Sequence, residues 1–441
     1  MNSIDRDVVI ASTTPRARDR RTDRAPRWMK DVTVSDGGVV IFARGDAGRA
    51  RGGGWTRALA TRACAASRAT TSWDGEHFVA LALDGYAFEH QHAFYPGLPI
   101  ATRAVVTTVK RAVGATGADD ARDACATRAA ATTLNTIAFA ASVEALYAPS
   151  RELPKDDALA EAAATLYAMN PANVFYGSAY TEAGFAYAQF VAGTMLQENK
   201  MLASGVAFGV ATMFRSNGVL CVVPLLAHAG REVFLLLRNA EDATRHRRAA
   251  RHVKRAMLAV ALAIAPHYAF ALFGDMRYCN GALFDGAERP YCRPKSWRTL
   301  YGLVPSGMYS CIQKRYWNLG FMSSYRPRNL GNVLLGAPAI ALGFYLSKRF
   351  AFSQDERAFV KDAQRVFVGA YFAQLAMMTV IAATYMHVQV ATRFLSTSPA
   401  MYWGLASLGR DSVPWRRVVA AYHVAYALVG AALFANFYPW T

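Results

Sequence analysis

Long apolar blocks recur along the chain and constrain its structure more than any other feature. They run for roughly 15–25 residues, which is about the length that crosses the hydrocarbon core of a bilayer. The clearest blocks are residues 131–148, 172–196, 256–274, 332–347, 366–386 and 418–437. A soluble helical protein would have to cover all of them with its few polar helices. We therefore predict an all-α polytopic membrane protein with about eight membrane spans.

Polar breaks divide several of these blocks and mark where helices should end. The Asn-Pro pair at 170–171 should interrupt one block, because proline disfavours helix at its own position and at the preceding one. The RSNG sequence at 215–218 interrupts another. Residues 73–98 mix carboxylates, histidines and aromatic side chains, which indicates a folded loop at the membrane surface that is partly amphipathic helix. A long polar segment, 275–330, precedes the last apolar blocks.

Residues 1–72 differ from the rest of the chain. They hold fourteen Arg and Lys and seven Asp, and their longest apolar stretch is Val39–Ala43. Such a composition does not support an apolar core, and the segment lacks the apolar region of a secretory signal. We predict that residues 1–72 are disordered or mis-assigned and that residues 73–441 form the membrane domain.

The formal charge of +18 is compatible with nucleic-acid binding, but the placement of the cations argues against it. Seven Arg and Lys lie within residues 238–255, directly before an apolar block. Short loops dense in Arg and Lys stay on the cytosolic side of a membrane. We predict that this loop is cytosolic and that nucleic acid is not a partner. Contact with anionic lipid is the lesser alternative for this loop.

Charged and polar residues in or beside apolar segments are costly, and so they are candidates for function. They include carboxylates, guanidinium groups and amides, which together suit a substrate bearing a phosphate and a sugar. The candidates are Asp74, Glu76, Glu89, Glu182, Arg215, Trp317, Asn318, His387 and Arg393. For any one of them taken alone, structural pairing is the simpler interpretation.

Seven ordered motifs carry a resemblance to a known family. They are WDGEHF, GYAFEHQHAFYPGLP, NPANVFYGSAYTEAGFA, RSNG, SCIQKRYWNLGF, HVQVATRF and the terminal NFYPWT. From residue 72 to its last residue the chain resembles the GPI mannosyltransferase II (PIG-V) family. The resemblance implies the GT-C membrane glycosyltransferase fold, with the active site on luminal loops. That family has a membrane span ahead of its WD motif, whereas residues 1–72 contain no apolar stretch of that length.

The resemblance also implies a reaction. It is the transfer of the second mannose of the glycosylphosphatidylinositol core, in α1,6 linkage, on the luminal face of the endoplasmic reticulum. The donor would be dolichyl phosphate mannose and the acceptor the mannosyl-glucosaminyl-phosphatidylinositol intermediate. The remaining implied partners are the endoplasmic reticulum membrane and, as a further candidate, a small membrane subunit. No nucleotide sugar is needed, because the donor is lipid-linked. We expect no cofactor and no metal.

Transfer from a β-linked mannosyl phosphate to an α-mannoside inverts the anomeric carbon. A carboxylate should take the proton of the acceptor hydroxyl, and the leaving phosphate needs cationic or hydrogen-bonding support. Asp74 resembles the carboxylate of the first luminal loop in GT-C enzymes, so we predict it as the base, with Glu76 and His77 as the next candidates. The residues predicted to bind donor or acceptor are Trp73, Glu89, Glu182, Asn217, Gln313, Trp317, Asn318, His387 and Gln389, with Arg215, Lys314 and Arg393 as candidates for the donor phosphate.

Six cysteines show no spacing typical of a zinc site. Cys279 and Cys292 share the polar segment that follows the apolar block 256–274. If the basic loop before that block is cytosolic, this segment lies in the oxidising lumen, where exposed thiol pairs tend to be joined. We predict a disulfide between Cys279 and Cys292. The alternatives are two free thiols, or a bridge from one of them to Cys311.

Three other functions are compatible with the same sequence. A different mannosyltransferase that uses dolichyl phosphate mannose would share the chemistry and differ in its acceptor. A polytopic lipid or solute transporter would also place charges in the membrane, but transporters often show paired halves and the chain shows none. A non-catalytic subunit is disfavoured by the intact WD motif.

Overall fold

The computed structural model describes residues 33–35, 38–40, 64, 67–114, 120–153, 157–238, 244–279, 289, 291–292, 307–353, 360, 364–436, 438 and 440. The chain forms two compact units, residues 1–51 and 52–441. In the first unit, strands β1 (Thr33–Ser35) and β2 (Gly38–Val40) pair antiparallel. Most of residues 1–72, which we predicted to be disordered, lie outside the described residues.

The second unit is helical over most of its described length. Its longest helices are α5 (Asp120–Arg151), α10 (Val222–Arg238), α11 (Arg245–Cys279), α14 (Leu330–Phe352), α16 (Arg365–Thr384) and α19 (Val413–Ala435). The shorter helices are α3 (Asp74–Asp84), α4 (Gly97–Ala112), α6 (Asp157–Ala168), α7 (Asn173–Tyr176), α8 (Glu182–Gln197), α9 (Met201–Phe214), α13 (Met308–Trp317), α17 (Ala391–Leu395) and α18 (Pro399–Asp411). Four segments are 3-10 helices, namely η3 (Glu89–Ala93), η4 (Ser216–Cys221), η5 (Pro327–Asn329) and η7 (Val388–Val390).

Six helices within the described residues are long and apolar enough to cross a membrane, and they are α5, α10 with η4, α11, α14 with η5, α16 and α19. The predicted all-α, multi-spanning architecture is therefore confirmed. The number is below eight because two apolar blocks form only short helices, α8 with 16 residues and α9 with 14. These helices reach about 24 and 21 Å, less than the ~30 Å hydrocarbon core. Both predicted polar breaks are present: α6 ends before the Asn-Pro pair, and α9 ends at the RSNG sequence.

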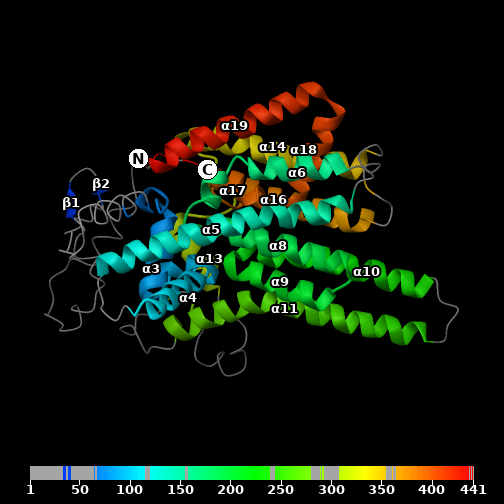
Figure 1. Cartoon of the computed structure of the whole chain (residues 1–441), viewed down its shortest axis with the longest axis horizontal. Coiled ribbons are helices and arrows are strands. Elements are labelled where there is room, and N and C mark those ends of the chain that lie inside the picture. The colour runs from blue at the N-terminus through cyan, green and yellow to red at the C-terminus, as the bar shows by residue number, and fades with distance from the viewer. Residues whose placement is uncertain are drawn as a thin grey trace. The chain divides into compact units, whose positions relative to one another are not determined.

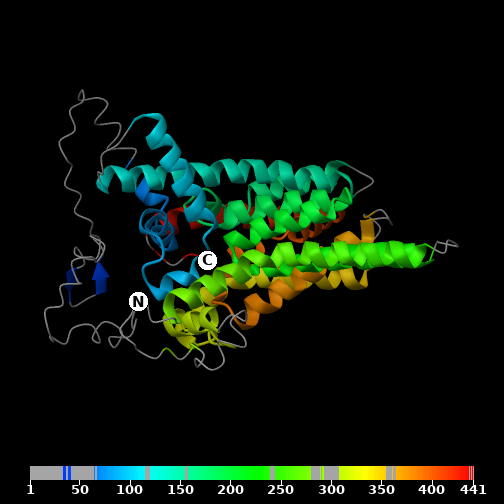
Figure 2. The same cartoon turned by 90° about the horizontal axis from the view of Figure 1, so that it is seen from below.

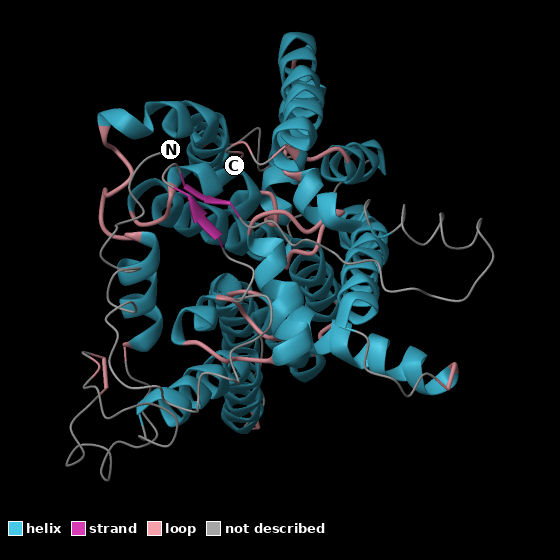
Figure 3. Ribbon diagram, turned by 90° about the vertical axis from the view of Figure 1, so that its left-hand side faces the viewer, coloured by secondary structure: helices cyan, strands magenta, loops and turns pink. Residues whose placement is uncertain are grey.

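The long helices lie side by side along one direction (Figures 1 and 2). The end of α10 and the start of α11 lie at one end of this bundle, on the right in Figure 1. Helices α3, α4 and α13 gather at the other end, in both views. Figure 3 looks from that second end, and the long helices are seen nearly end-on. The basic start of α11 and the WD motif at the start of α3 are thus at opposite ends of the bundle.

Burial distinguishes the central helices from those that face lipid. In α16, 56% of the apolar window is buried, compared with 22–28% in the other five candidate spans. Helix α9 packs against both α8 and α11. A Cβ atom at Gly205 or Gly209 of α9 would lie 2.6 Å from the carbonyl oxygen of Ala259 or Leu262 in α11. Small residues four positions apart allow this close approach, which stabilises helix pairs in a membrane by van der Waals contact.

Candidate active site

A cavity of about 560 Å³ lies among α3, η4, α13, η7 and α17. These segments come from widely separated parts of the chain, and each contributes at least one polar side chain to the wall. Eight of the residues predicted from the sequence line this cavity, and they are Asp74, Arg215, Asn217, Gln313, Trp317, His387, Gln389 and Arg393. The fold therefore brings most of the predicted set to one place.

Two carboxylates and two guanidinium groups form a connected ion network at this cavity. Arg393 Nη2 donates to Asp74 Oδ2 at 3.0 Å, and Arg393 Nη1 lies 3.7 Å from Glu182 Oε1. Arg215 Nη1 also pairs with Glu182 Oε1, and Arg215 lies 3.4 Å from the Thr181 hydroxyl. Glu182 is fully buried and does not line the cavity. It lies behind the two arginines, so its position suits holding them rather than touching a substrate.

The loop before α8 packs against Arg393. Asn135 of α5 donates its amide to the carbonyl oxygens of Ser178 and Tyr180, which fixes this loop. The Arg393 guanidinium lies over the rings of Phe175 and Tyr180, at 5.1 and 5.4 Å from their centroids. Burial alone would lower the pKa of Arg393, but Asp74 and Glu182 raise it above its ordinary value. The guanidinium therefore stays charged.

Helix geometry separates Asp74 from its neighbours in the WD motif. Successive helical residues differ in direction by about 100°, so Asp74 and Glu76 point to nearly opposite sides of α3. Asp74 lines the cavity, whereas Glu76 pairs with Arg128 at 3.1 Å on the other side. His77 stacks on Phe94 at 4.5 Å between centroids and does not line the cavity. Burial lowers the pKa of His77, although Asp74 and Glu76 oppose that shift.

Trp73, immediately before α3, does not line the cavity either. The residue is 45% exposed, and its backbone has a φ of 59°, which is unusual for a bulky residue. Such backbone strain persists where the surrounding fold imposes it, and it often lies next to functional groups. Trp73 is the N-cap of α3 and directly precedes Asp74.

One face of α13 contributes Tyr309, Gln313 and Trp317 to the cavity. These residues are four apart, so they lie one above another along the helix. Lys314, predicted as a phosphate ligand, lies off this face and is exposed. Asn318 ends the helix in the left-handed conformation, with φ 51° and ψ 33°, a position that favours asparagine or glycine. Asn318 is therefore a helix cap and is absent from the cavity lining.

Further hydrogen-bond donors complete the wall. His387 Nε2 lies 2.5 Å from the Trp317 carbonyl oxygen, which can only accept, so Nε2 carries the proton. Asn217 Oδ1 accepts from Arg215 Nε at 3.3 Å, and its Nδ2 has no hydrogen-bond partner among the described residues. A buried amide donor of this kind is suited to a phosphate or sugar oxygen.

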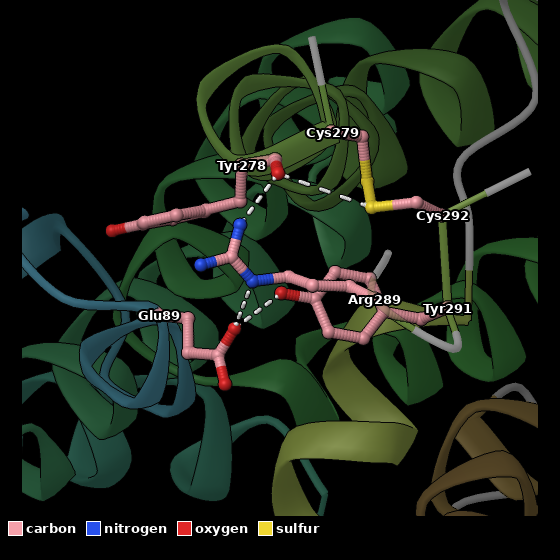
Figure 4. The surroundings of a disulfide bond; sticks show 6 residues. All are labelled: Glu89, Tyr278, Cys279, Arg289, Tyr291 and Cys292. Carbon is pink, nitrogen blue, oxygen red and sulfur yellow. Dashed lines mark hydrogen bonds and ion pairs between the residues drawn. A yellow bond between two sulfur atoms is a disulfide. The ribbon is translucent and has the colours of Figure 1, made fainter. Parts of the chain in front are cut away.

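Glu89 lies away from the cavity and anchors a disulfide-linked segment (Figure 4). Cys279 and Cys292 form the predicted disulfide, with Cα atoms 5.4 Å apart. Glu89 accepts hydrogen bonds from Tyr291 and Tyr316, each at 2.6 Å, and its Oε2 lies 2.6 Å from Arg289 Nε. Burial would raise the pKa of Glu89, but the tyrosine hydrogen bonds and Arg289 lower it overall. The structure thus gives Glu89 a structural set of partners instead of the predicted place beside a substrate.

A second disulfide joins Cys64 to Cys125 near the start of α5, with Cα atoms 5.4 Å apart. The sequence analysis did not predict it, because Cys64 lies in the segment that was expected to be disordered. The two cysteines are 61 residues apart, and no local pattern links them. Both disulfides lie at the end of the bundle that carries α3, where α5 begins and α11 ends (Figures 1 and 2).

Several aromatic residues also line the cavity, and the sequence analysis missed them because it selected candidates by charge and polarity. They are Phe78, Phe94, Tyr95, Phe214, Tyr309, Tyr385 and Phe394. Phe94 and Tyr95 belong to the FYPGLP part of one of the seven motifs, and this position in a motif could have identified them as site residues. Their rings make the cavity largely apolar, with a few charged groups concentrated at one wall.

Lipid-exposed helices around a cavity that holds carboxylates, guanidinium groups and amides define a multi-spanning membrane protein with a polar site near one end of the bundle. The mannosyltransferase (PIG-V) family matches residues 59–441, and the chain belongs to this family. The family assignment confirms the resemblance seen in the seven motifs, and the protein is accordingly a mannosyltransferase, a membrane glycosyltransferase.

Named relatives agree with the family. The chain is 29% identical over 444 residues to a GPI mannosyltransferase 2 of Chaetomium globosum, covering 93% of this chain and 90% of the relative. It is 28% identical over 443 residues to the human GPI alpha-1,6-mannosyltransferase 2, covering 84% and 87%. An oligosaccharyltransferase structure from Archaeoglobus fulgidus aligns with a TM-score of 0.37 and 15% identity over 85% of this chain. The alignment spans 49% of that larger protein.

Proposed function

We propose that this protein transfers a mannosyl group from dolichyl phosphate mannose to a mannosyl-glucosaminyl-phosphatidylinositol acceptor, forming an α1,6 linkage with inversion. The observation that carries the proposal is the position of Asp74, a carboxylate in the wall of a cavity that also presents Arg215 and Arg393. The names of the fungal and human relatives support mannose transfer in GPI synthesis, and the name of the human relative supports the α1,6 linkage.

The luminal side of the endoplasmic reticulum is the proposed location of the cavity. The arginine-rich start of α11 lies at the end of the bundle opposite α3, and arginine-rich segments favour the cytosol. Both disulfides of the described residues lie at the α3 end. Disulfides persist in oxidising compartments and are rare in the cytosol. These two independent features support the same orientation.

Asp74 is the proposed general base. Its side chain is about one-third exposed within the cavity, so a substrate hydroxyl can reach it, while Arg393 fixes one carboxylate oxygen. The acceptor oxygen forms a bond to the anomeric carbon as its proton moves to Asp74. The bond from that carbon to the phosphate oxygen breaks, and the electron pair leaves with dolichyl phosphate. One in-line displacement of this kind inverts the anomeric carbon.

The two arginines have different proposed roles. Arg393 contacts both carboxylates through its two terminal nitrogens, so it orients Asp74. The contacts of Arg215 use Nε and Nη1, which leaves Nη2 for the donor phosphate. Because two carboxylates already balance the two guanidinium groups, neutral donors such as Asn217 Nδ2 and the Gln313 amide are needed to support the leaving phosphate.

Transfer of labelled mannose in microsomes tests the proposal. Membranes containing this protein should convert the mannosyl-glucosaminyl acceptor when dolichyl phosphate mannose is supplied, and an α1,6-specific mannosidase should release the label. Expression in cells that each lack one dolichol-dependent mannosyltransferase should rescue only the second-mannose defect. Rescue of a different mutant would instead assign another acceptor, and absence of any transfer would remove the enzymatic proposal.

A further inference from the structure

A second, smaller cavity adjoins the candidate active site. Its volume is about 200 Å³, and its wall includes His92 of η3, His267 and Phe270 of α11, and the start of α13. It shares Tyr95, Tyr309 and Ser310 with the main cavity, so these three residues form a common wall. We refer to this space as the side cavity. Nothing in the proposed transfer step uses it.

His92 is the unusual residue of the side cavity. The residue is 3% exposed, and neither Nδ1 nor Nε2 has a hydrogen-bond partner among the described residues. Its ring stacks on Phe270, with centroids 4.6 Å apart and an interplanar angle of 4°, and it also contacts the ring of Tyr278 edge-on. A buried polar group that lacks a partner is costly, so its retention calls for a ligand or a functional reason.

The environment keeps this imidazole neutral. Burial, and after it the nearby Arg277, lower the pKa of His92 to about 3. A neutral imidazole has one N–H donor and one acceptor nitrogen. It therefore pairs well with a hydroxyl group, which also donates and accepts.

The other lining residues narrow the class of ligand. Among the described residues of the side-cavity wall there is no Arg, Lys, Asp or Glu. A phosphate would lack charged partners there, and the described residues hold no group of three or more His, Cys, Asp or Glu that could bind a metal ion. Phe270, Tyr95 and Tyr309 instead supply aromatic surface, and the Tyr95 hydroxyl is held by His267 Nδ1 at 2.5 Å. Aromatic surface with a few hydroxyl-compatible groups suits a sugar ring.

We propose that the side cavity binds the sugar next to the accepting mannose in the acceptor glycolipid, and that His92 determines its recognition by pairing with a ring hydroxyl. This inference rests on the proposed function, because it assigns the second sugar of that acceptor. With the accepting hydroxyl at Asp74, the rest of the acceptor must leave the main cavity on the way to its lipid. The side cavity lies against α11, and Phe273 and Met276 of this helix are exposed apolar side chains, which suits contact with the lipid of the acceptor.

Steady-state kinetics of His92→Phe test this assignment. Phenylalanine keeps the aromatic stack and removes both nitrogens. The KM for mannosyl-glucosaminyl-phosphatidylinositol should rise roughly ten- to hundredfold, which is the usual effect of losing one buried hydrogen bond to a ligand. The KM for dolichyl phosphate mannose and kcat at saturating acceptor should stay unchanged. His92→Asn, which restores one donor and one acceptor, should recover part of the affinity.

His90→Phe is the matched control, because His90 lies two residues away in η3 and lines neither cavity. It should leave both KM values unchanged. Glucosaminyl-phosphatidylinositol, which lacks the accepting mannose, should inhibit the wild type competitively and inhibit His92→Phe much more weakly. An unchanged acceptor KM in His92→Phe, or an equal rise in the donor KM, would overturn the inference.

The proposed function can fail separately from this inference. In that case the wild type transfers no mannose to the acceptor. The side cavity can then be tested directly by adding glucosaminyl-phosphatidylinositol to the purified protein. Its binding is measured as an increase in thermal stability. Stabilisation of the wild type and of His90→Phe, but not of His92→Phe, supports the site, and equal stabilisation of all three overturns it.

Discussion

Arg393 Nη2 lies 3.0 Å from Asp74 Oδ2, although the two residues are 319 positions apart in the sequence. The same guanidinium reaches Glu182, so one arginine joins the WD helix to the first residue of α8. The position of the proposed base is therefore set by a residue near the other end of the chain. The functional unit exists only when the helical bundle is assembled.

Replacing Asp74 by Asn should abolish mannose transfer while the protein is still expressed and inserted. The amide keeps the shape of the carboxylate but cannot take the acceptor proton, and loss of a positioned base typically costs ~10²–10⁴-fold in rate. Transfer per unit of immunodetected protein measures the effect. Glu76→Gln is the control, because Glu76 pairs with Arg128 outside the cavity. Near-normal activity of Asp74→Asn would remove Asp74 as the base.

Glu182→Gln should lower the stability of the protein. Glu182 is fully buried and pairs with two arginines, and breaking a buried pair by removing one partner typically costs about 3–5 kcal/mol. Thermal unfolding in detergent measures the change. Glu198→Gln is the matched control, since Glu198 forms an exposed pair with Lys200 at 2.8 Å that should contribute about 0–1 kcal/mol. Equal effects of the two substitutions would contradict the structural role of Glu182.

Arg215→Lys and Arg393→Lys should change different kinetic constants. A lysine cannot reproduce bidentate contacts to phosphate or carboxylate. Arg215→Lys should raise the KM for dolichyl phosphate mannose, whereas Arg393→Lys should mainly lower kcat, because it releases Asp74. Donor titrations at saturating acceptor separate the two. A donor-bound structure in which both arginines contact only protein carboxylates would rule out the phosphate role.

Cysteine labelling in sealed microsomes should place the two ends of the bundle on opposite sides of the membrane. Leu83, at the end of α3, and Ala250, in the basic part of α11, are both exposed. In a background with Cys311→Ser, a cysteine at 250 should react with an impermeant reagent added outside, and one at 83 should react only after permeabilisation. Gly75 is buried and less suitable as a probe. Outside labelling at position 83 would contradict a luminal active site.

Both disulfides should be present in the native protein and should stabilise it. In the chain-entropy model, joining Cys279 to Cys292 contributes roughly 3 kcal/mol, and the longer loop closed by Cys64 and Cys125 roughly 4 kcal/mol. Paired Ser substitutions with thermal unfolding measure these contributions. Peptide mapping without reductant identifies the pairs, and alkylation of all four cysteines in the native protein would show that neither bridge forms.

The sequence alone determined the class of the protein and the broad identity of its site. Apolar block lengths predict membrane helices because the thickness of the bilayer is constant, and the breaks at 170–171 and 215–218 are local consequences of Pro and of polar residues. The ordered motifs also named most of the residues that line the cavity. Cys279 and Cys292 could be paired from topology and compartment, because only a short segment separates them.

Only the tertiary structure decided which polar residue faces which partner. Asp74 and Glu76 are two carboxylates of the same motif, and the sequence does not distinguish their surroundings. Because they are about 200° apart around the helix, Asp74 lines the cavity and Glu76 pairs with Arg128. Glu182 and Glu89 were predicted to bind donor or acceptor, yet one is buried behind two arginines and the other holds a disulfide-linked segment. The reason is that ion pairing depends on distances between atoms. Here those distances join segments that are up to 319 residues apart, and no local pattern records them.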